Sequence, residues 1–111
     1  MPYTATHLAQ PPSREDIDRL TGATVLEFGT PWCPHCQRAQ PLIEGALKDR
    51  AEVTHLKVED GPGQRLGRSF AVKLWPTLVF LKDGKEVERL VRPQGQQDIV
   101  NALQAIAAPA G

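Results

Sequence analysis

A short apolar run, Thr24–Phe28, sets narrow limits on the architecture of this chain. Val25, Leu26 and Phe28 place apolar side chains on both faces of an extended segment, which is typical of a central strand covered by helices on both sides. Glu27 is the one ionisable residue in the run. A short loop and two cysteines at the start of a helical pattern follow, so the order strand, loop, helix predicts an α/β fold with both thiols at the loop-to-helix junction.

The rest of the chain continues this alternation. Ser13 can cap a short helix that reaches about Leu20, with Asp16 in the capping-box position. Apolar residues at helical spacing predict one amphipathic helix from the cysteines to about Arg50. A tight Asp-Gly turn within Lys82–Lys85 predicts a β-hairpin. The other expected elements are strands at Thr4–Leu8, Glu52–Val58, Thr77–Leu81 and Glu86–Val91, and helices at Gln64–Phe70 and Gln96–Ala107.

These elements predict a mixed central sheet with helices on both faces, in a single domain over residues 1–111 with an N-terminal arm (1–12) and a frayed tail (108–111). A chain of 111 residues is long enough for one core and too short for a separate substrate domain. Thirteen Lys and Arg balance thirteen Asp and Glu, so no net charge attracts nucleic acid or an anionic membrane. No signal peptide or bilayer-spanning segment is visible, and we expect a cytoplasmic monomer.

Cys33 and Cys36 are the only cysteines, and two residues separate them. At a helix start, Cys33 meets unpaired backbone N–H groups and the positive end of the helix dipole, which favour the thiolate. One helical turn brings Cys36 close enough to close a small disulfide ring. Because so short a loop constrains the unfolded chain little, reversible exchange is favoured over a structural disulfide.

The segment Trp32-Cys33-Pro34-His35-Cys36, with Trp75-Pro76-Thr77 downstream, resembles the thioredoxin family of thiol-disulfide oxidoreductases. The resemblance extends from about Ser13 to Ala107 and includes a glutamate six residues before the first cysteine, Pro41 within the helix and the Asp-Gly hairpin. It implies a thioredoxin-like fold whose redox centre is the cysteine pair itself, with no other cofactor. It also implies a cis proline, here Pro76, that faces the disulfide.

The two thiols then have different roles. Cys33 is the nucleophile that forms a mixed disulfide with the substrate, and Cys36, expected to be the more buried thiol, resolves it. A zinc site is disfavoured, because zinc needs four ligands and the histidines show no usual ligand spacing: His7, His35 and His55.

Pro34 and His35 occupy the two positions between the cysteines and are expected to tune the pair. Pro34 at the first helical position lacks only an N–H that would be unpaired in any case. His35 can donate to the Cys33 thiolate or stabilise it by charge, which makes the pair more oxidising; a plain exposed helix histidine is the alternative. Pro-His resembles the dipeptide of the periplasmic disulfide-forming oxidases, whereas reducing thioredoxins usually carry Gly-Pro.

Glu27 matches the position of a buried acid beneath the second cysteine in the family. Burial would raise its pKa and allow it to take the Cys36 proton, directly or through water; the alternative is a strand glutamate that reaches an edge of the sheet. The family's lysine partner for this acid corresponds to His55, with Lys57 next on the same face, and a register error would exchange the two.

The resemblance also predicts a substrate groove made by Trp32, Trp75, Pro76 and Thr77, with Trp32 packed over the disulfide. Three positions depart from the family: Gly29 replaces a common tryptophan, Trp75 replaces an aliphatic residue, and Arg92-Pro93 lies near a usual glycine. We therefore expect an altered groove.

The sequence favours a reductase of protein disulfides that contributes to cell redox homeostasis. Its partners would be disulfide-containing proteins and a thiol or disulfide reductase that donates electrons. Two alternatives remain open: a more oxidising oxidase or isomerase on the same fold, and a binding module that uses the groove while the cysteines stay idle.

Overall fold

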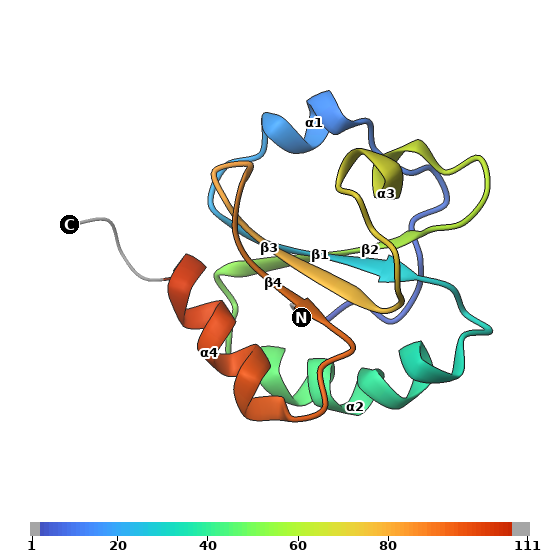
Figure 1. Cartoon of the computed structure of the whole chain (residues 1–111). Helices are drawn as coiled ribbons and strands as arrows, with labels where there is room; N and C mark the ends of the chain where they lie inside the picture. The colour runs from blue at the N-terminus through green and yellow to red at the C-terminus, as the bar shows by residue number, and fades with distance from the viewer. Residues whose placement is uncertain (1–2, 108–111) are drawn as a thin grey trace.

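The computed structural model describes residues 3–107 (Figure 1). The expected alternation of helices and strands is confirmed from Ser13 onward, whereas the expected tail, 108–111, lies outside the described residues. In chain order the elements are α1 (Arg14–Asp18), β1 (Ala23–Gly29), α2 (Pro34–Leu47), β2 (Val53–Glu59), α3 (Arg65–Ser69), β3 (Thr77–Lys82), β4 (Lys85–Val91) and α4 (Gln96–Ala107).

The four strands form one mixed sheet in the order β2-β1-β3-β4. β1 pairs with β2 in parallel and with β3 in antiparallel orientation, and β4 pairs antiparallel with β3. The central place of β1 confirms the prediction from its doubly apolar run. Its register sets Glu27 beside Lys57 of β2 and Leu78 of β3.

Helices cover both faces of the sheet, with α1 and α3 on one side and α2 and α4 on the other (Figure 1). Val25 belongs to the core cluster that contains residues of α2 and α4, and Leu26 to the cluster that contains residues of α1 and α3. Because side chains alternate along a strand, Glu27 shares the face of Val25 and points toward α2. The mixed α/β architecture that the sequence predicts is confirmed.

The helix starts follow their local sequence. Ser13 caps α1, and it forms the expected reciprocal capping box with Asp16. Helix α2 has Cys33 as its N-cap and contains Pro41. It ends at Leu47, before the expected Arg50, because the chain turns there: the Arg50 N–H donates to the Leu47 carbonyl at 3.0 Å.

The strand expected at Thr4–Leu8 is not formed. This arm runs beside β2, and the Leu8 N–H donates to the Lys57 carbonyl at 2.8 Å. The Thr4 N–H, however, donates to a side chain, His55 Nδ1, at 2.8 Å. A backbone donor used in this way cannot join a strand ladder, so the arm stays irregular.

The hairpin between β3 and β4 turns at Asp83 and Gly84, as the Asp-Gly pair predicts. Both residues have positive φ, 51° and 80°, which is the conformation of a two-residue hairpin turn. The turn docks on the loop before β1, since the Gly22 N–H donates to Asp83 Oδ1 at 2.8 Å. Gly84 lies so close to the end of α1 that a Cβ there would collide with the Asp18 carbonyl oxygen.

Replacing Gly84 with alanine is expected to lower the free energy of unfolding by about 2 kcal/mol or more, because it adds left-handed strain to a backbone collision. Urea denaturation measures this loss. Gly95→Ala is the matched control: nothing lies within 4 Å of its Cβ position, and we expect a change below about 0.5 kcal/mol. Equal effects of the two substitutions would contradict this packing of the hairpin.

Candidate active site

The two thiols lie at the start of α2 and are both free and buried. Cys33 is 5% exposed and Cys36 3%, so Cys36 is the more buried, as expected, by a small margin. As the N-cap residue, Cys33 accepts a hydrogen bond at its Sγ from the Cys36 N–H at 3.2 Å. This bond, together with the helix dipole, favours negative charge on the Cys33 sulfur.

Cys36 has the opposite environment. Burial raises the pKa of its thiol to about 12, and the hydrogen bond with Cys33 and the charge of Glu27 act in the same direction. At neutral pH Cys36 is therefore a protonated thiol. The site combines one sulfur that accepts a backbone hydrogen bond at the helix start with one that keeps its proton.

The sulfur of Cys36 is packed against the end of β1. A Cβ on Gly29 would lie 2.5 Å from Cys36 Sγ and 4.0 Å from Trp75 Cβ. The lack of a side chain at Gly29, where the family often has tryptophan, thus leaves room for Cys36 in this conformation. It also shows that the loop of Trp75 lies close to the redox pair.

The loop before β3 supplies an aromatic surface. The Trp75–Pro76 peptide bond is cis, as the resemblance implies. The hydroxyl of Thr77, which was predicted to line the groove, donates to the Leu74 carbonyl at 2.6 Å and so stabilises the loop. Trp32 is 68% exposed and meets Trp75 edge to face, with ring centroids 5.7 Å apart. The indole N–H of Trp75 donates to Asp60 Oδ2 at 2.9 Å, which fixes the ring.

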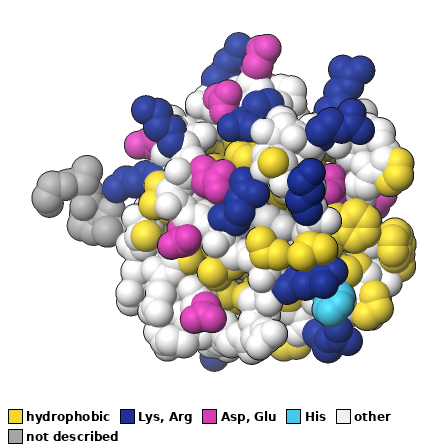
Figure 2. All heavy atoms as spheres, viewed as in Figure 1, with side chains coloured by type: hydrophobic (Ala, Val, Ile, Leu, Met, Phe, Trp, Pro, Cys, Tyr) yellow, Lys and Arg dark blue, Asp and Glu magenta, His cyan; other side chains and the backbone are white. Residues whose placement is uncertain are grey.

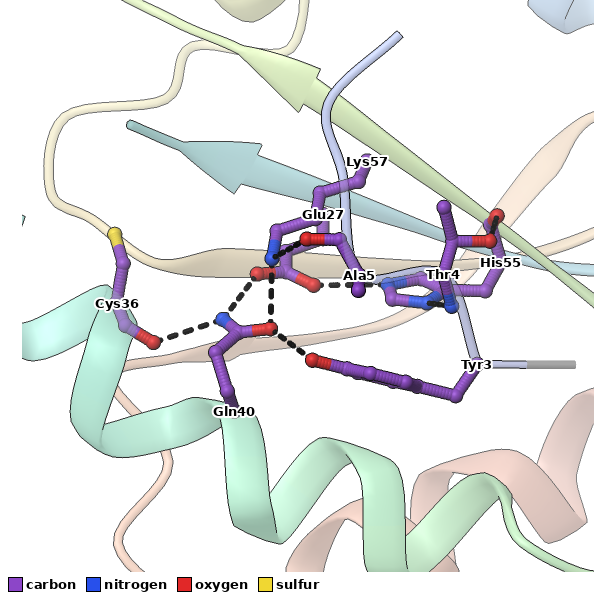
Figure 3. A network of polar contacts seen from close by, with 8 residues as sticks. All are labelled: Tyr3, Thr4, Ala5, Glu27, Cys36, Gln40, His55 and Lys57. Atoms are coloured by element: carbon purple, nitrogen blue, oxygen red, sulfur yellow. Dashed lines mark hydrogen bonds and ion pairs between the residues drawn. The ribbon is translucent and has the colours of Figure 1, made fainter. Parts of the chain in front are cut away.

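Glu27 lies behind the cysteines, 1% exposed, in a network of polar contacts (Figure 3). His55 Nε2 is 2.8 Å from its Oε1, and Gln40 Nε2 donates to its Oε2 at 2.8 Å. Of the two partners left open by the sequence, His55 contacts Glu27 directly. Lys57 reaches it through Gln40, because Lys57 Nζ donates to Gln40 Oε1 at 2.8 Å.

This network reverses the expected pKa of Glu27. Burial raises the pKa, but the hydrogen bonds from His55 and Gln40 and the charge of Lys57 outweigh burial, and the pKa of Glu27 lies below its ordinary value. The expectation of a raised pKa is wrong, because it counted burial without these donors. Glu27 is thus a buried carboxylate in the resting protein.

The N-terminal arm fixes the hydrogen on His55. A backbone N–H can only donate, so the bond from the Thr4 N–H requires an unprotonated Nδ1 on His55. The ring hydrogen then lies on Nε2, where it is donated to Glu27. Tyr3 stacks on the same ring, with centroids 5.5 Å apart. The arm thereby leaves Nε2 as the ring nitrogen of His55 that donates to the carboxylate.

Gln40 connects this network to the redox helix. Its Oε1 accepts from both Lys57 Nζ and the Tyr3 hydroxyl, each at 2.8 Å, which fixes the orientation of the amide. Its Nε2 therefore faces Glu27 and the Cys36 carbonyl oxygen, 2.8 Å away. Figure 3 shows that Cys36 turns its carbonyl toward Gln40 while its sulfur points away. Gln40 thus links Glu27 to the backbone carbonyl of Cys36, and within residues 3–107 no hydrogen bond joins Glu27 to the thiol itself.

A pocket of about 400 Å³ lies between the arm and the start of α2. Cys36, Gln40 and Lys57 line it, together with Thr30, whose buried hydroxyl has no hydrogen-bond partner within residues 3–107. This pocket connects the surroundings of the Cys36 thiol with the ammonium group of the network.

His35 does not supply the positive charge that was one of its two expected roles. Arg38 lies with a terminal nitrogen 3.0 Å from His35 Nδ1, and since a guanidinium only donates, Nδ1 carries no hydrogen. Partial desolvation of the ring and the charges of Arg92 and Arg38 also lower the pKa of His35. The ring is neutral at neutral pH, with Nε2–H left as its donor. Pro34 occupies the first helical position, as predicted.

Several contributing residues were missed by sequence reasoning. Gln40 follows Cys36 by one helical turn, and this spacing is the signal that was available. Tyr3, Thr4 and Asp60 reach the site only because the fold brings distant segments together, and no local pattern marks them.

Within residues 3–107 no group of three or more potential metal ligands converges, and no helix is both long and apolar enough to cross a membrane.

Comparison with known proteins gives the same picture. The family model of the thioredoxins matches residues 7–105. Thioredoxin of Chlamydia trachomatis is 31% identical over 83 residues, which cover 75% of this chain and 81% of that protein. Thioredoxin H-type 1 of Nicotiana tabacum is 33% identical over 78% of this chain and 68% of its own length. The structure of reduced thioredoxin 2 from Pseudomonas aeruginosa superposes with a TM-score of 0.84 at 54% identity, covering 95% and 97% of the two chains.

Proposed function

The chain belongs to the thioredoxin family of thiol-disulfide oxidoreductases, and we propose that it reduces disulfides of other proteins in the cytoplasm through Cys33 and Cys36. The observation that carries this proposal is the asymmetry of the pair. Cys33 Sγ accepts a backbone N–H bond at the helix start, whereas the pKa of Cys36 is raised to about 12. One sulfur is ready to attack and the other keeps its proton until it is needed.

The exchange has two steps. The Cys33 thiolate attacks one sulfur of a substrate disulfide, that S–S bond breaks, and the released substrate sulfur takes a proton. Cys36 then loses its proton and attacks Cys33, which releases the second substrate thiol and forms the Cys33–Cys36 disulfide. Two electrons pass to the substrate. A thiol or disulfide reductase returns two electrons to the pair, and no other cofactor is required.

Glu27 is proposed to accept the Cys36 proton indirectly. Its carboxylate is buried and linked to the residue only through Gln40 and the Cys36 carbonyl. The pocket provides space for a solvent molecule beside Cys36, and Gln40, which also lines the pocket, donates to Glu27 and so connects the pocket with the carboxylate. The roles of Trp32, Trp75 and Pro76 as the substrate surface belong to the same proposal.

The direction of exchange is the finer part of the proposal. The Pro34-His35 dipeptide favours an oxidase, and this second function requires His35 to stabilise the thiolate strongly. The contact with Arg38 makes the ring neutral, which removes the charge that would do so. We therefore favour net reduction and a contribution to cell redox homeostasis.

The redox potential of the pair tests this direction. The protein is equilibrated in graded glutathione buffers, and the Cys33–Cys36 disulfide is quantified by alkylation and mass. A reductase is expected near or below roughly −250 mV. A potential near roughly −150 mV or above would contradict net reduction and assign an oxidase or isomerase. Absence of any exchange with glutathione would contradict both and leave the binding module.

A further inference from the structure

Basic side chains line a second pocket, on the opposite side of the helix start from the arm. This pocket of about 520 Å³ lies between the beginning of α2 and the loop from β4 to α4. It is lined by His35, Arg38, Ala39, Leu42, Arg92, Pro93 and Gln94, among which there is no carboxylate. Figure 2 shows basic side chains and a histidine gathered beside a hydrophobic patch.

The positive charge of this pocket is not compensated locally. Arg14, Arg50 and Arg89 each form an ion pair with a carboxylate. Within residues 3–107 neither Arg38 nor Arg92 has such a partner. Since the whole chain has a formal net charge of zero, this excess is local and lies at the rim of the redox site.

Arg92 is held at this place by the backbone of the cis-proline loop. Its N–H donates to the Pro76 carbonyl at 2.9 Å, and its Nε donates to the Trp75 carbonyl at 2.8 Å. Its φ of 51° lies in the left-handed region, where glycine is favoured. Trp75 in turn contacts Trp32, the residue before Cys33. The guanidinium is thus fixed to the backbone of the loop whose Trp75 packs against the residue before Cys33.

We propose that the pocket of His35, Arg38 and Arg92 binds carboxylates of the substrate, so that the preferred substrates are protein disulfides flanked by aspartate or glutamate. This inference rests on the proposed exchange function and adds its substrate class. Guanidinium groups bind carboxylates through paired, charge-assisted hydrogen bonds. Trp32 and Trp75 supply the apolar surface beside them, so an acidic segment meets charge and aromatic area together.

Two disulfide-linked peptides test this preference. They differ only in the residues next to the cysteine, two glutamates in one and two glutamines in the other. The reduced protein is mixed with each, and the second-order rate constant of a single turnover is measured by fluorescence. We expect the glutamate peptide to react about fivefold faster at low salt, with the ratio falling toward one at about 0.5 M NaCl.

The ratio of the two rates separates binding of charge from structural damage, because damage lowers both rates. The double variant Arg38→Gln/Arg92→Gln is expected to bring the ratio below about 1.5, and Arg92→Lys, which keeps the charge, to preserve most of it. Arg65→Gln is the matched control, since it removes one arginine charge on α3 outside this pocket. We expect it to leave the ratio unchanged.

Four outcomes would overturn the inference. A wild-type ratio near one at low salt, or a preference that survives the double variant, shows that the pocket does not select carboxylates. If low salt accelerates the reduction of oxidised glutathione as much as that of the glutamate peptide, the pocket binds carboxylates of small disulfides and does not select protein substrates. A protein that reduces neither peptide contradicts the exchange function itself, and the inference with it.

Discussion

Replacing Cys33 with serine is expected to lower the rate of protein-disulfide reduction at least about 1,000-fold and to leave behind a thiol of very low reactivity. The first loss follows from removing the nucleophile. The second follows from the environment of Cys36, whose main cause of a raised pKa, burial, does not depend on Cys33. Loss of disulfide reduction alone could also come from a misfolded variant. Low reactivity of the remaining Cys36 thiol shows that the site is still folded around it.

The reactivity of the remaining Cys36 can be estimated from its pKa. In the wild type a rise from 9.0 to about 12 lowers the thiolate fraction at neutral pH about 1,000-fold, and because Cys33 causes part of this rise, 1,000-fold is the upper limit for the variant. A more basic thiolate is intrinsically more nucleophilic, which regains about 15- to 30-fold. Through its pKa alone, alkylation of Cys36 by iodoacetamide should therefore be slower than that of an ordinary exposed thiol by up to about 30- to 60-fold, and limited access to the buried sulfur slows it further. The rate should rise about tenfold per pH unit from pH 7 to 10 without a plateau.

Cys36→Ser is the matched control, because it keeps the other thiol. We expect Cys33 in this variant to be alkylated readily and to form a stable mixed disulfide with a substrate protein, visible by mass, since no resolving thiol is present. Rapid alkylation of Cys36 in the Cys33→Ser variant, with a plateau below pH 9, would contradict the division of roles. Retained disulfide reduction by that variant would contradict the mechanism.

Those parts of the fold that local patterns determine were predictable from the sequence. The doubly apolar run predicted the central strand β1, the capping pair Ser13 and Asp16 predicted α1, and the Asp83-Gly84 turn predicted the hairpin. In each case neighbouring residues decide the conformation. The fold class and the position of the thiols follow from these elements and from the family resemblance.

The errors arose where distant residues meet. The arm was expected to form a strand, yet Thr4 gives its N–H to a histidine 51 residues away. The pKa direction of Glu27 depends on donors from α2 and β2, and the lowered pKa of His35 depends in part on the charge of Arg92, from the loop after β4. Such contacts depend on packing between elements. The strand pattern predicts only that Glu27 is buried, and burial alone would shift its pKa in the opposite direction.

A second large effect is expected at the buried pair behind the thiols. Replacing His55 with leucine leaves Glu27 as an ionised group, 1% exposed, without its strongest donor. Leaving a buried carboxylate without a hydrogen-bond donor in this way is expected to lower the free energy of unfolding by about 3–5 kcal/mol at pH 7.5. Urea denaturation of the reduced proteins measures the difference from the wild type.

The pH dependence of this loss identifies its cause. In the wild type the pKa of Glu27 lies below its ordinary value, so its stabilising contribution is fully present above the unfolded pKa and is lost only as the pH falls through the lower folded value. In His55→Leu burial dominates and raises the folded pKa. Glu27 then destabilises the variant increasingly as the pH rises through that value, and the difference from the wild type should shrink between about pH 7.5 and pH 5.

The double variant Glu27→Leu/His55→Leu separates the carboxylate from the loss of packing. With neither group present, no charge remains buried without a donor, and exchanging both partners for apolar residues costs less than removing one. We expect this variant to be more stable than His55→Leu at pH 7.5, with a difference from the wild type that stays constant down to pH 5. A His55→Leu loss that is equally constant with pH would show that the histidine acts through packing, and that Glu27 does not depend on it for its charge.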